Sequence, residues 1–267
     1  MNIGFLITAR LKSTRLKLKV IKFLNGYTVI DRVIQRAKQV KGCSDIVLCT
    51  SHFNQDLPLV RSAIENDIYY YNGNPEDVLQ RLLDAAELFN MDYVIGITAD
   101  NPMFSIHHAN IIADMFRVDN SHDFIYTTGM PIGVNIYGMS TRALKTVCSI
   151  KEEIDTEIWG YLINRPEIFN VKEIKVDDKY QGGDYRMTLD EPDDYEFFTQ
   201  LYNMFSKDDV IDVLDVYLCL EENPDMADIN SSVVQKDLDE DIKKRISRFY
   251  ENNKDRILDL KRKIYSE

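Results

Sequence analysis

The sequence predicts an α/β protein of three layers, α/β/α, in which helices cover both faces of a mostly parallel, mixed sheet. Two observations support this prediction. Short apolar runs alternate with longer segments of helical periodicity through the N-terminal half, which is the pattern of consecutive βα units. Beyond about Ser206 the composition changes to charged segments of helical period. We therefore expect a sheet domain at 1–205 and a helical C-terminal extension at 206–267.

The N-terminal half supplies the alternating elements. Apolar, partly β-branched runs predict strands at 3–8, 46–49, 68–71 and 93–98. Apolar residues spaced three and four apart predict helices at 29–40, 57–64 and 75–89, the last with Pro75 in its first turn. In βα units ligands bind outside the carboxyl ends of the strands, so the site is expected there.

The C-terminal half is less regular. We expect strands at 124–127 and 134–137 on either side of a turn, and further strands at 171–174 and 185–189. The last of these should lead into a helix that starts at Pro192. Helical periodicity predicts the remaining helices at 152–164, 208–221 and 238–264, with a break at 223–224.

Composition excludes several classes of protein. Of the 267 residues 45% are hydrophobic and 28% charged, as in ordinary globular domains, and the net charge of −12 argues against a nucleic-acid partner. No apolar run approaches the roughly 18 residues of a membrane span, and Met1-Asn2 leads directly into a strand, so we expect neither membrane association nor a signal sequence. Four scattered cysteines without metal-ligand spacing indicate a reduced, cytoplasmic protein.

A basic loop follows the first strand. It contains six cations and no acid, against the overall sign of the chain: Arg10, Lys12, Arg15, Lys17, Lys19 and Lys22. Fixed cations and hydroxyl donors at the carboxyl end of a strand suit the phosphates of a nucleotide, because they replace the water that solvates them. The alternative is a solvated surface loop, since charge runs are usually surface features.

Two acidic residues are candidates for a magnesium site. Asp100 follows the strand predicted at 93–98, and Asp190 follows the strand predicted at 185–189. Mg²⁺ is held by one or two carboxylates together with substrate phosphates and water, so this pair would suffice. The structural alternatives are a turn-forming Asp before Asn101-Pro102 and an N-cap before the helix at Pro192.

The spacing of the basic loop resembles a known family. Its pattern, formed by Ala9, Arg10, Ser13, Arg15 and Lys19, is similar to the opening signature of the CMP-sugar and sugar-nucleotide cytidylyltransferases, and most similar to their spore-coat-polysaccharide SpsF branch. The segments around Asp100 and Asp190 also resemble paired signatures of that family. The resemblance implies a nucleotide-diphospho-sugar transferase-like, Rossmann-like sheet.

A third segment, 72–81, resembles a family segment whose aspartate and arginine lie near the nucleotide, which here are Asp77 and Arg81. The alternative for these two residues is a surface ion pair between positions i and i+4 of a helix, worth ~0.3–0.5 kcal/mol.

The sequence departs from the family in two places. The family has Pro-Gly between its second arginine and its lysine, where this chain has Lys17-Leu18, and loss of the glycine should hinder close folding of the loop on phosphates. In the half that should bind the acceptor, residues 132, 135, 137 and 158 are Ile, Asn, Tyr and Ile, where the family has Asp, Asp, Glu and His. A less negative pocket suits a more anionic acceptor or one with fewer hydroxyls.

The resemblance implies transfer of CMP from CTP to an acceptor, with release of pyrophosphate. We expect Arg15, Lys19 and Asp100 to be catalytic and Asp100 and Asp190 to bind Mg²⁺. The residues expected to bind the nucleotide are Ala9, Arg10, Ser13, Arg15, Lys19, Asp77 and Arg81. The acceptor would be an acidic sugar, a sugar phosphate or a small phosphorylated or phosphonate compound of cell-surface polysaccharide or glycoconjugate biosynthesis.

Two other functions remain open at this point. A glycosyltransferase of related architecture would use a nucleotide sugar, but it usually has an Asp-x-Asp metal motif, and Asp100-Asn101-Pro102 lacks the second Asp. A non-catalytic nucleotide-binding module would not need both Asp100 and Asp190. The C-terminal helices are expected to serve association or packing rather than chemistry, and a homodimer is one form that association could take.

Overall fold

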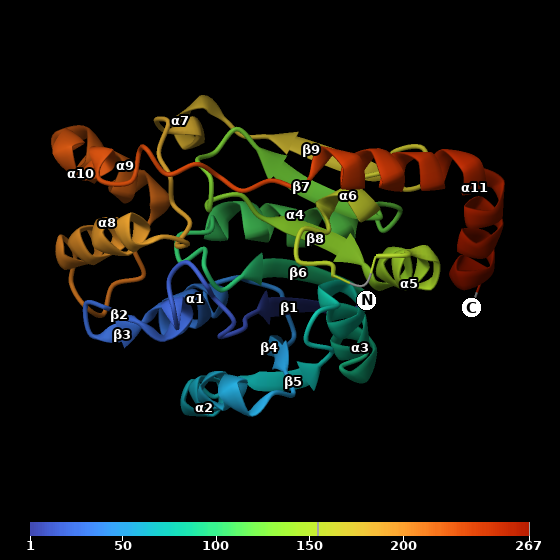
Figure 1. Ribbon diagram of the computed structural model, residues 1–267, viewed down its shortest axis with the longest axis horizontal. Helices are drawn as coiled ribbons and strands as arrows, with labels where there is room; N and C mark the ends of the chain where they lie inside the picture. Colours follow the sequence, from blue (N-terminus) through green and yellow to red (C-terminus); the bar gives the residue numbers. More distant parts are fainter. Residues whose placement is uncertain (154, 267) are drawn as a thin grey trace.

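A seven-stranded mixed sheet lies between two layers of helices (Figure 1). This computed structural model describes residues 1–153 and 155–266. The strand order is β5-β4-β1-β6-β8-β7-β9, and among the described strands of this sheet only β8 runs antiparallel to its neighbours. The strands are β1 Ile3–Thr8, β4 Ile46–Ser51, β5 Tyr69–Gly73, β6 Tyr93–Thr98, β7 Phe124–Thr128, β8 Tyr137–Ser140 and β9 Val171–Lys175.

The register of the central strands determines where the site can form. In β1, Thr8 pairs with Cys49 of β4 on one side and with Thr98 of β6 on the other. The three strands are parallel, so their carboxyl ends reach one edge of the sheet together. The basic loop after β1 and Asp100 after β6 therefore leave the sheet side by side.

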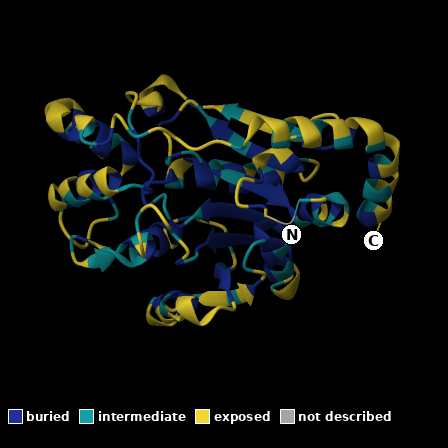
Figure 2. Ribbon diagram, in the orientation of Figure 1, coloured by how far each residue is buried: buried dark blue, intermediate teal, exposed yellow. Residues whose placement is uncertain are grey.

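Two helical layers bury the faces of the sheet. Phe5 and Ile7 of β1 face a core built with α1 (Val29–Ala37), α2 (Leu57–Glu65) and α4 (Ile106–Val118). Leu6 faces the opposite core, which is built with α3 (Val78–Leu88), α5 (Thr141–Ile150), α6 (Gly160–Ile163) and α11 (Glu240–Ser266). This alternation follows from the two-residue period of a strand. Figure 2 shows the sheet as the buried layer between helices whose outer faces are exposed.

A third apolar cluster closes one end of the molecule. It joins the hairpin of β2 (Phe23–Leu24) and β3 (Tyr27–Thr28) to α7 (Asp178–Gln181), α8 (Pro192–Asn203), α9 (Val213–Glu222) and α10 (Pro224–Asp228). Two buried arginines of α1 attach this end to the sheet domain. Arg32 donates to the carbonyl oxygens of Leu24 and Lys207, and Arg36 donates to those of Phe104 and Ile211.

The C-terminal segment crosses from one end of the molecule to the other (Figure 1). Residues 229–239, which we call the strap, run from α10 to α11, and α11 packs against α5. The boundary predicted between 205 and 206 stays a prediction. No helix within 1–153 and 155–266 is long and apolar enough to cross a membrane.

Several predicted elements are corrected. The strand expected at 134–137 is β8, which begins only at Tyr137, and it leads through a Ser140 cap into α5, which was not predicted. The described part of 152–164 is helical only over the single turn of α6; residue 154 of that prediction lies outside the described residues. Helix α3 begins at Val78, because Asp77 caps it, so Pro75 precedes the helix.

The strand expected at 185–189 is also wrong. This segment is extended but belongs to no strand, since its amides bond elsewhere: Met187 N–H donates to the Ile132 carbonyl at 2.7 Å, and Leu189 N–H donates to the Asp100 carbonyl at 2.8 Å. The second bond brings Asp190 beside the end of β6.

Candidate active site

A cavity of about 260 Å³ opens at the carboxyl edge of β1 and β6. Three stretches provide most of its lining, at 8–20, 75–81 and 98–100, and we call it the basic cavity. Of the residues predicted to bind nucleotide, it is lined by Ala9, Arg10, Ser13, Arg15, Lys19 and Arg81.

Asp56, which the sequence analysis missed, anchors the start of the basic loop. Its carboxylate is fully buried and accepts the N–H of Leu11 at 2.8 Å, and it also accepts the hydroxyl of Ser51. Asp56 lies in the short 3₁₀ turn η2 (Asn54–Asp56), directly after β4. A lone Asp before an apolar helix gives no sequence signal for such a role.

The loop turns back toward the cavity at Leu18. Its φ of 57° and ψ of 27° are left-handed, and the 3₁₀ turn η1 (Lys19–Ile21) begins immediately after it. This is the position where the resembling family has glycine, which adopts this conformation without steric strain. We expected the loss of glycine to hinder this turn. The loop nevertheless makes the turn, with Leu18 in the left-handed conformation that glycine favours.

Lys19 lies between the two candidate metal ligands. Its ammonium donates to Asp100 Oδ2 and to Asp190 Oδ1, each at 2.7 Å, so these two oxygens are separated by at most twice that distance. Burial favours a lower pKa for Lys19 and a higher one for Asp100. The attraction between the charges outweighs burial, so the pKa of Lys19 lies above its ordinary value and that of Asp100 below its ordinary value. Both groups are charged at neutral pH.

Two arginines also hold Asp190. Arg15 contacts Asp190 Oδ1 and Glu191 Oε1, each at 3.1 Å. On the other side, Arg186 Nη2 donates to Asp190 Oδ2 at 3.2 Å, and Arg186 Nε donates to Asp194 at 2.9 Å. Three basic side chains therefore converge on one carboxylate, which fixes its position.

Arg10 and Lys12 face a single acid across the basic cavity. Arg10 Nη1 lies 3.3 Å from Glu76 Oε2, and the Lys12 ammonium lies 3.0 Å from the same oxygen. Arg10 also donates to the carbonyl of Pro75. Glu76, which was not predicted, precedes α3, and these basic partners lower its pKa.

Asp77 and Arg81 do not form the surface ion pair considered as their alternative. Asp77 caps α3 by accepting the Gln80 N–H, and its carboxylate also accepts the Thr156 hydroxyl at 3.0 Å and the Lys151 ammonium. Arg81 is 1% exposed and donates to the Asn74 carbonyl at 2.7 Å. Arg81 lines the basic cavity, whereas Asp77 is not among the residues that line it.

The carboxylates of Asp100 and Asp190 fit a divalent cation whose other ligands come from a bound phosphate and from water. Within the described parts of the chain no three Asp, Glu, His or Cys side chains gather as a metal site. Asp100 and Asp190 converge on one point, which the Lys19 ammonium occupies. Mg²⁺ accepts such a pair when phosphate oxygens and water complete its shell.

A larger cavity of about 660 Å³ adjoins the basic cavity. Five aromatic residues line it, so we call it the aromatic cavity: Phe124, Tyr126, Tyr137, Trp159 and Tyr161. Of the four positions where the sequence departs from the family, Asn135, Tyr137 and Ile158 line this cavity. Ile132 does not line it, and instead forms a bridge with Arg186.

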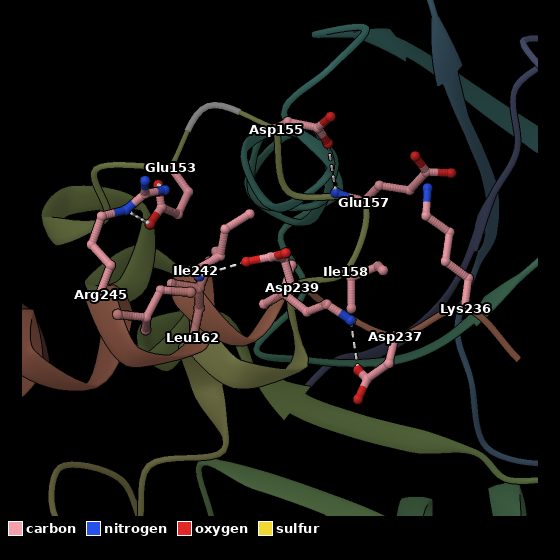
Figure 3. A pocket seen from close by; sticks show the side chains of 12 residues that line it. Glu153, Asp155, Glu157, Ile158, Leu162, Lys236, Asp237, Asp239, Ile242 and Arg245 are labelled. Atoms are coloured by element: carbon pink, nitrogen blue, oxygen red, sulfur yellow. Dashed lines mark hydrogen bonds and ion pairs between the residues drawn. The ribbon is translucent and has the colours of Figure 1, made fainter.

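Glu157 and Lys236 line both cavities and were not predicted as site residues. They also line a third cavity, of about 580 Å³, between residues 155–162 and the start of α11 (Figure 3). In Figure 3 the Lys236 ammonium faces the Glu157 carboxylate. Lys236 belongs to the strap, and an isolated lysine in a charged segment gives no signal of a site.

Comparisons with known proteins agree with this geometry. A family model described as cytidylyltransferase matches residues 5–224. The chain is 24% identical over 233 residues to the spore coat polysaccharide biosynthesis protein SpsF of Bacillus subtilis, which covers 85% of this chain and 97% of SpsF. It is also similar in structure to a cytidylyltransferase from Leptospira borgpetersenii, with a TM-score of 0.79, 24% identity, and coverage of 89% of this chain and 100% of that one.

More distant solved structures share the fold. The CMP:2-keto-3-deoxy-manno-octonic acid synthetase complexed with CTP superimposes with a TM-score of 0.61 at 16% identity, over 76% of this chain and 99% of that one. Rv0371c of Mycobacterium tuberculosis, solved in complex with manganese, has a TM-score of 0.54 at 16% identity, over 75% of this chain and 99% of that one. The predicted α/β fold is therefore confirmed. Because the family model spans most of its length, the chain belongs to the cytidylyltransferase family, whose members are nucleotidyltransferases.

Proposed function

We propose that this protein transfers CMP from CTP to an acidic or phosphorylated acceptor and releases pyrophosphate. The observation that supports this most strongly is the Lys19 ammonium, held at 2.7 Å from both Asp100 and Asp190. Lys19 and Asp100 line the basic cavity, and Asp190 lies next to them. The cytidylyltransferase family and a fold shared with a synthetase solved with CTP support the choice of nucleotide.

The basic side chains provide the charge that a triphosphate needs. Arg10, Arg15 and Lys19 line one cavity, and we assign them to the phosphates, with Lys19 and Arg15 nearest the α-phosphorus because they also contact Asp190. Ala9 and Ser13 line the same wall, and Arg81 lies at the α3 side. We assign Asp77 a supporting role through its cap on α3. Phosphoryl transfer depends mainly on such positioning and charge stabilisation.

A divalent cation would offset the negative charge of the acidic residues in this site. In the structure the basic side chains are already paired with Glu76, Asp100, Asp190 and Glu191, so an incoming triphosphate meets acids as well as bases. We assign Asp100 and Asp190 as the ligands of Mg²⁺, which would supply positive charge between these carboxylates and the phosphates. A manganese complex of a protein with this fold supports a divalent metal.

The acceptor is assigned to the aromatic cavity. An acceptor that attacks through a phosphate, phosphonate or carboxylate oxygen needs no general base, whereas a hydroxyl acceptor must lose its proton. We place the reaction in cell-surface polysaccharide or glycoconjugate biosynthesis, which the relative SpsF supports by name, and in the cytoplasm. Four free cysteines, three of them with a pKa raised to about 12 by burial, are consistent with a reducing compartment.

Release of pyrophosphate tests the proposal. The protein is incubated with CTP, UTP, GTP or ATP, with and without Mg²⁺, and with acidic and phosphorylated sugars. We expect release with CTP and Mg²⁺ only. Lys19→Ala should reduce kcat/KM by about 10- to 150-fold, the factor that corresponds to a charged hydrogen bond. Lys17→Ala is the matched control, since Lys17 is an exposed lysine of the same loop that does not line the basic cavity.

Calorimetry separates the metal from the chemistry. CTP should bind more weakly without Mg²⁺, and Asp100→Asn should remove most of the effect of Mg²⁺ on CTP binding. Equal release of pyrophosphate from all four nucleotides, or wild-type turnover by Lys19→Ala, would contradict the proposed function.

A further inference from the structure

The strap brings a lysine to the junction of two cavities. Lys236 and Glu157 are the residues that line both the basic and the aromatic cavity, so they mark the passage between them. Lys236 is exposed, and its ammonium makes no ion pair with any described residue of the chain. The Glu157 carboxylate that this ammonium faces forms no ion pair with it, so the cation at this passage can bind a negatively charged group of a ligand.

The strap is fixed on the site side by the same arginine that holds Asp190. Gln235 Oε1 accepts from Arg186 Nη1 at 2.5 Å. Asn230, which is 1% exposed, donates to the Arg186 carbonyl at 3.0 Å and to Asp194 at 2.9 Å. Arg186 in turn contacts Asp190 at 3.2 Å. The position of Lys236 is therefore tied through Gln235 and Arg186 to the acid that faces Lys19.

The strap is also fixed on the side of α11. The Asp237 carboxylate contacts the Lys243 ammonium at 2.5 Å, and Asp239 accepts the N–H of Asp241 at 2.8 Å at the start of α11. The residues on both sides of Lys236 are therefore held by side-chain contacts.

The aromatic cavity indicates what lies beside this cation. Trp159 and Tyr137 pack edge to face with ring centroids 4.7 Å apart, and Ile158 continues the apolar wall. Asn135 and Gln235 supply polar groups. Such a surface suits one face of a sugar ring, and among the residues that line the cavity Lys236 is the one cation.

We propose that Lys236 is a specificity-determining residue that binds the anionic group of the acceptor. The inference rests on the proposed function, since it takes the aromatic cavity as the acceptor site. The family match ends at residue 224, so Lys236 belongs to the part of this chain outside it. Its recognition of the acceptor is a feature of the strap rather than of the matched region.

The test uses full-length protein and four probes: glucuronate, glucose 1-phosphate, phosphonoacetate and uncharged glucose. Binding is measured by calorimetry for wild type, Lys236→Ala, Lys236→Glu and Lys236→Arg. We expect at least one anionic probe to bind wild type about tenfold or more tightly than Lys236→Ala, with a larger loss in Lys236→Glu and near-wild-type binding in Lys236→Arg. Affinity for CTP should fall by a smaller factor than affinity for that anionic probe, because Arg10, Arg15 and Lys19 also line the basic cavity and are assigned to the phosphates.

Three results would overturn the inference: equal binding of the anions to wild type and Lys236→Ala, glucose binding as tightly as the anions, or no binding of any anion to wild type. Pyrophosphate release is measured separately in the same variants. Anion binding that depends on Lys236 without pyrophosphate release would contradict the proposed function alone. CTP-dependent turnover with unchanged anion binding in Lys236→Ala would contradict this inference alone.

Discussion

The Lys19 ammonium lies 2.7 Å from the Asp190 carboxylate, although 171 positions separate the two residues in the chain. Asp100 completes the group at the same distance from Lys19. Three segments therefore meet at one point: the loop after β1, the end of β6 and the extended stretch before α8. The amide of Leu189 joins the last two, through its bond to the Asp100 carbonyl.

Lys19→Ala should lower the free energy of unfolding by about 1–3 kcal/mol, because it leaves Asp100 without its basic partner. The pKa of Asp100 should rise, since without Lys19 its burial is opposed only by the hydrogen bonds from Thr98 and the backbone. Urea denaturation checks the stability, and the double variant Lys19→Ala/Asp100→Asn should recover part of the loss without recovering activity. An unchanged urea midpoint in Lys19→Ala would show that the cluster contributes nothing to the fold.

The central sheet could be predicted from the sequence because its signals are local. The strands β1, β4 and β6 are mostly apolar runs, and their parallel pairing places their carboxyl ends at one edge of the sheet. The expectation that Asp100 and Asp190 approach each other agrees with their shared contact to Lys19. Metal binding by this pair stays a prediction.

The remainder depends on tertiary contacts that leave no local pattern. Residues 185–189 alternate like a strand, yet their amides bond to isolated carbonyls, so pattern alone misassigned them. Helix α5 was missed because its Ser140 cap is also the last residue of β8. Asp56 and Lys236 reach the site through folding of distant segments, which no spacing in the sequence reveals.

Leu18→Gly should stabilise the protein by about 0.5–1 kcal/mol. Leucine at φ 57° is strained by roughly 1–2 kcal/mol, and glycine relieves this but loses about 0.5–1 kcal/mol to the freedom of the unfolded chain. The Leu18 side chain is 49% exposed, so little packing is lost. Thermal and urea unfolding measure the change. Lys17→Gly is the control, because Lys17 has no positive φ and its replacement should only destabilise.

Tyr137→Phe should leave the free energy of unfolding unchanged or raise it by up to about 1–2 kcal/mol. The Tyr137 hydroxyl is buried without a hydrogen-bond partner in the described structure. Its removal therefore eliminates the free-energy cost of burying an unpaired polar group. Tyr217→Phe is the matched control, because that hydroxyl donates to the Tyr180 carbonyl at 3.1 Å and its loss should destabilise. Comparable losses in both variants, measured by urea denaturation, would contradict this prediction.

His108 should make the protein less stable in weak acid. Burial, assisted by the charge of His107, lowers the pKa of His108 to about 4, while Asp177 and Lys179 act on it in opposite directions. A lowered pKa means that the folded state favours the neutral form of His108. The contribution of neutral His108 to the free energy of unfolding is therefore complete above the ordinary histidine pKa near 6.5, and it declines as the pH falls toward 4. The loss over this range should be roughly 2–3 kcal/mol.

Urea midpoints at pH 7, 5.5 and 4.5 test this, with His108→Gln as the variant and the exposed His52→Gln as its control. The difference between wild type and His108→Gln should shrink as the pH falls, whereas His52→Gln should follow wild type. Parallel curves for wild type and His108→Gln would remove His108 from the acid response.

Truncation after Phe205 should prevent folding rather than release an active sheet domain. The removed segment supplies buried side chains to the cluster at the end of the molecule, namely Ile211, Val213, Val216, Tyr217 and Leu220. It also removes the Ile211 carbonyl, which accepts from fully buried Arg36 at 2.5 Å, so a guanidinium would lose a partner inside the core. Each buried apolar side chain contributes about 1.5–3 kcal/mol, so the combined loss exceeds the 5–15 kcal/mol stability of a typical domain. Circular dichroism and size-exclusion chromatography of the 1–205 fragment provide the measurement, and a folded, soluble monomer with cooperative unfolding would show that the C-terminal helices are dispensable for the core.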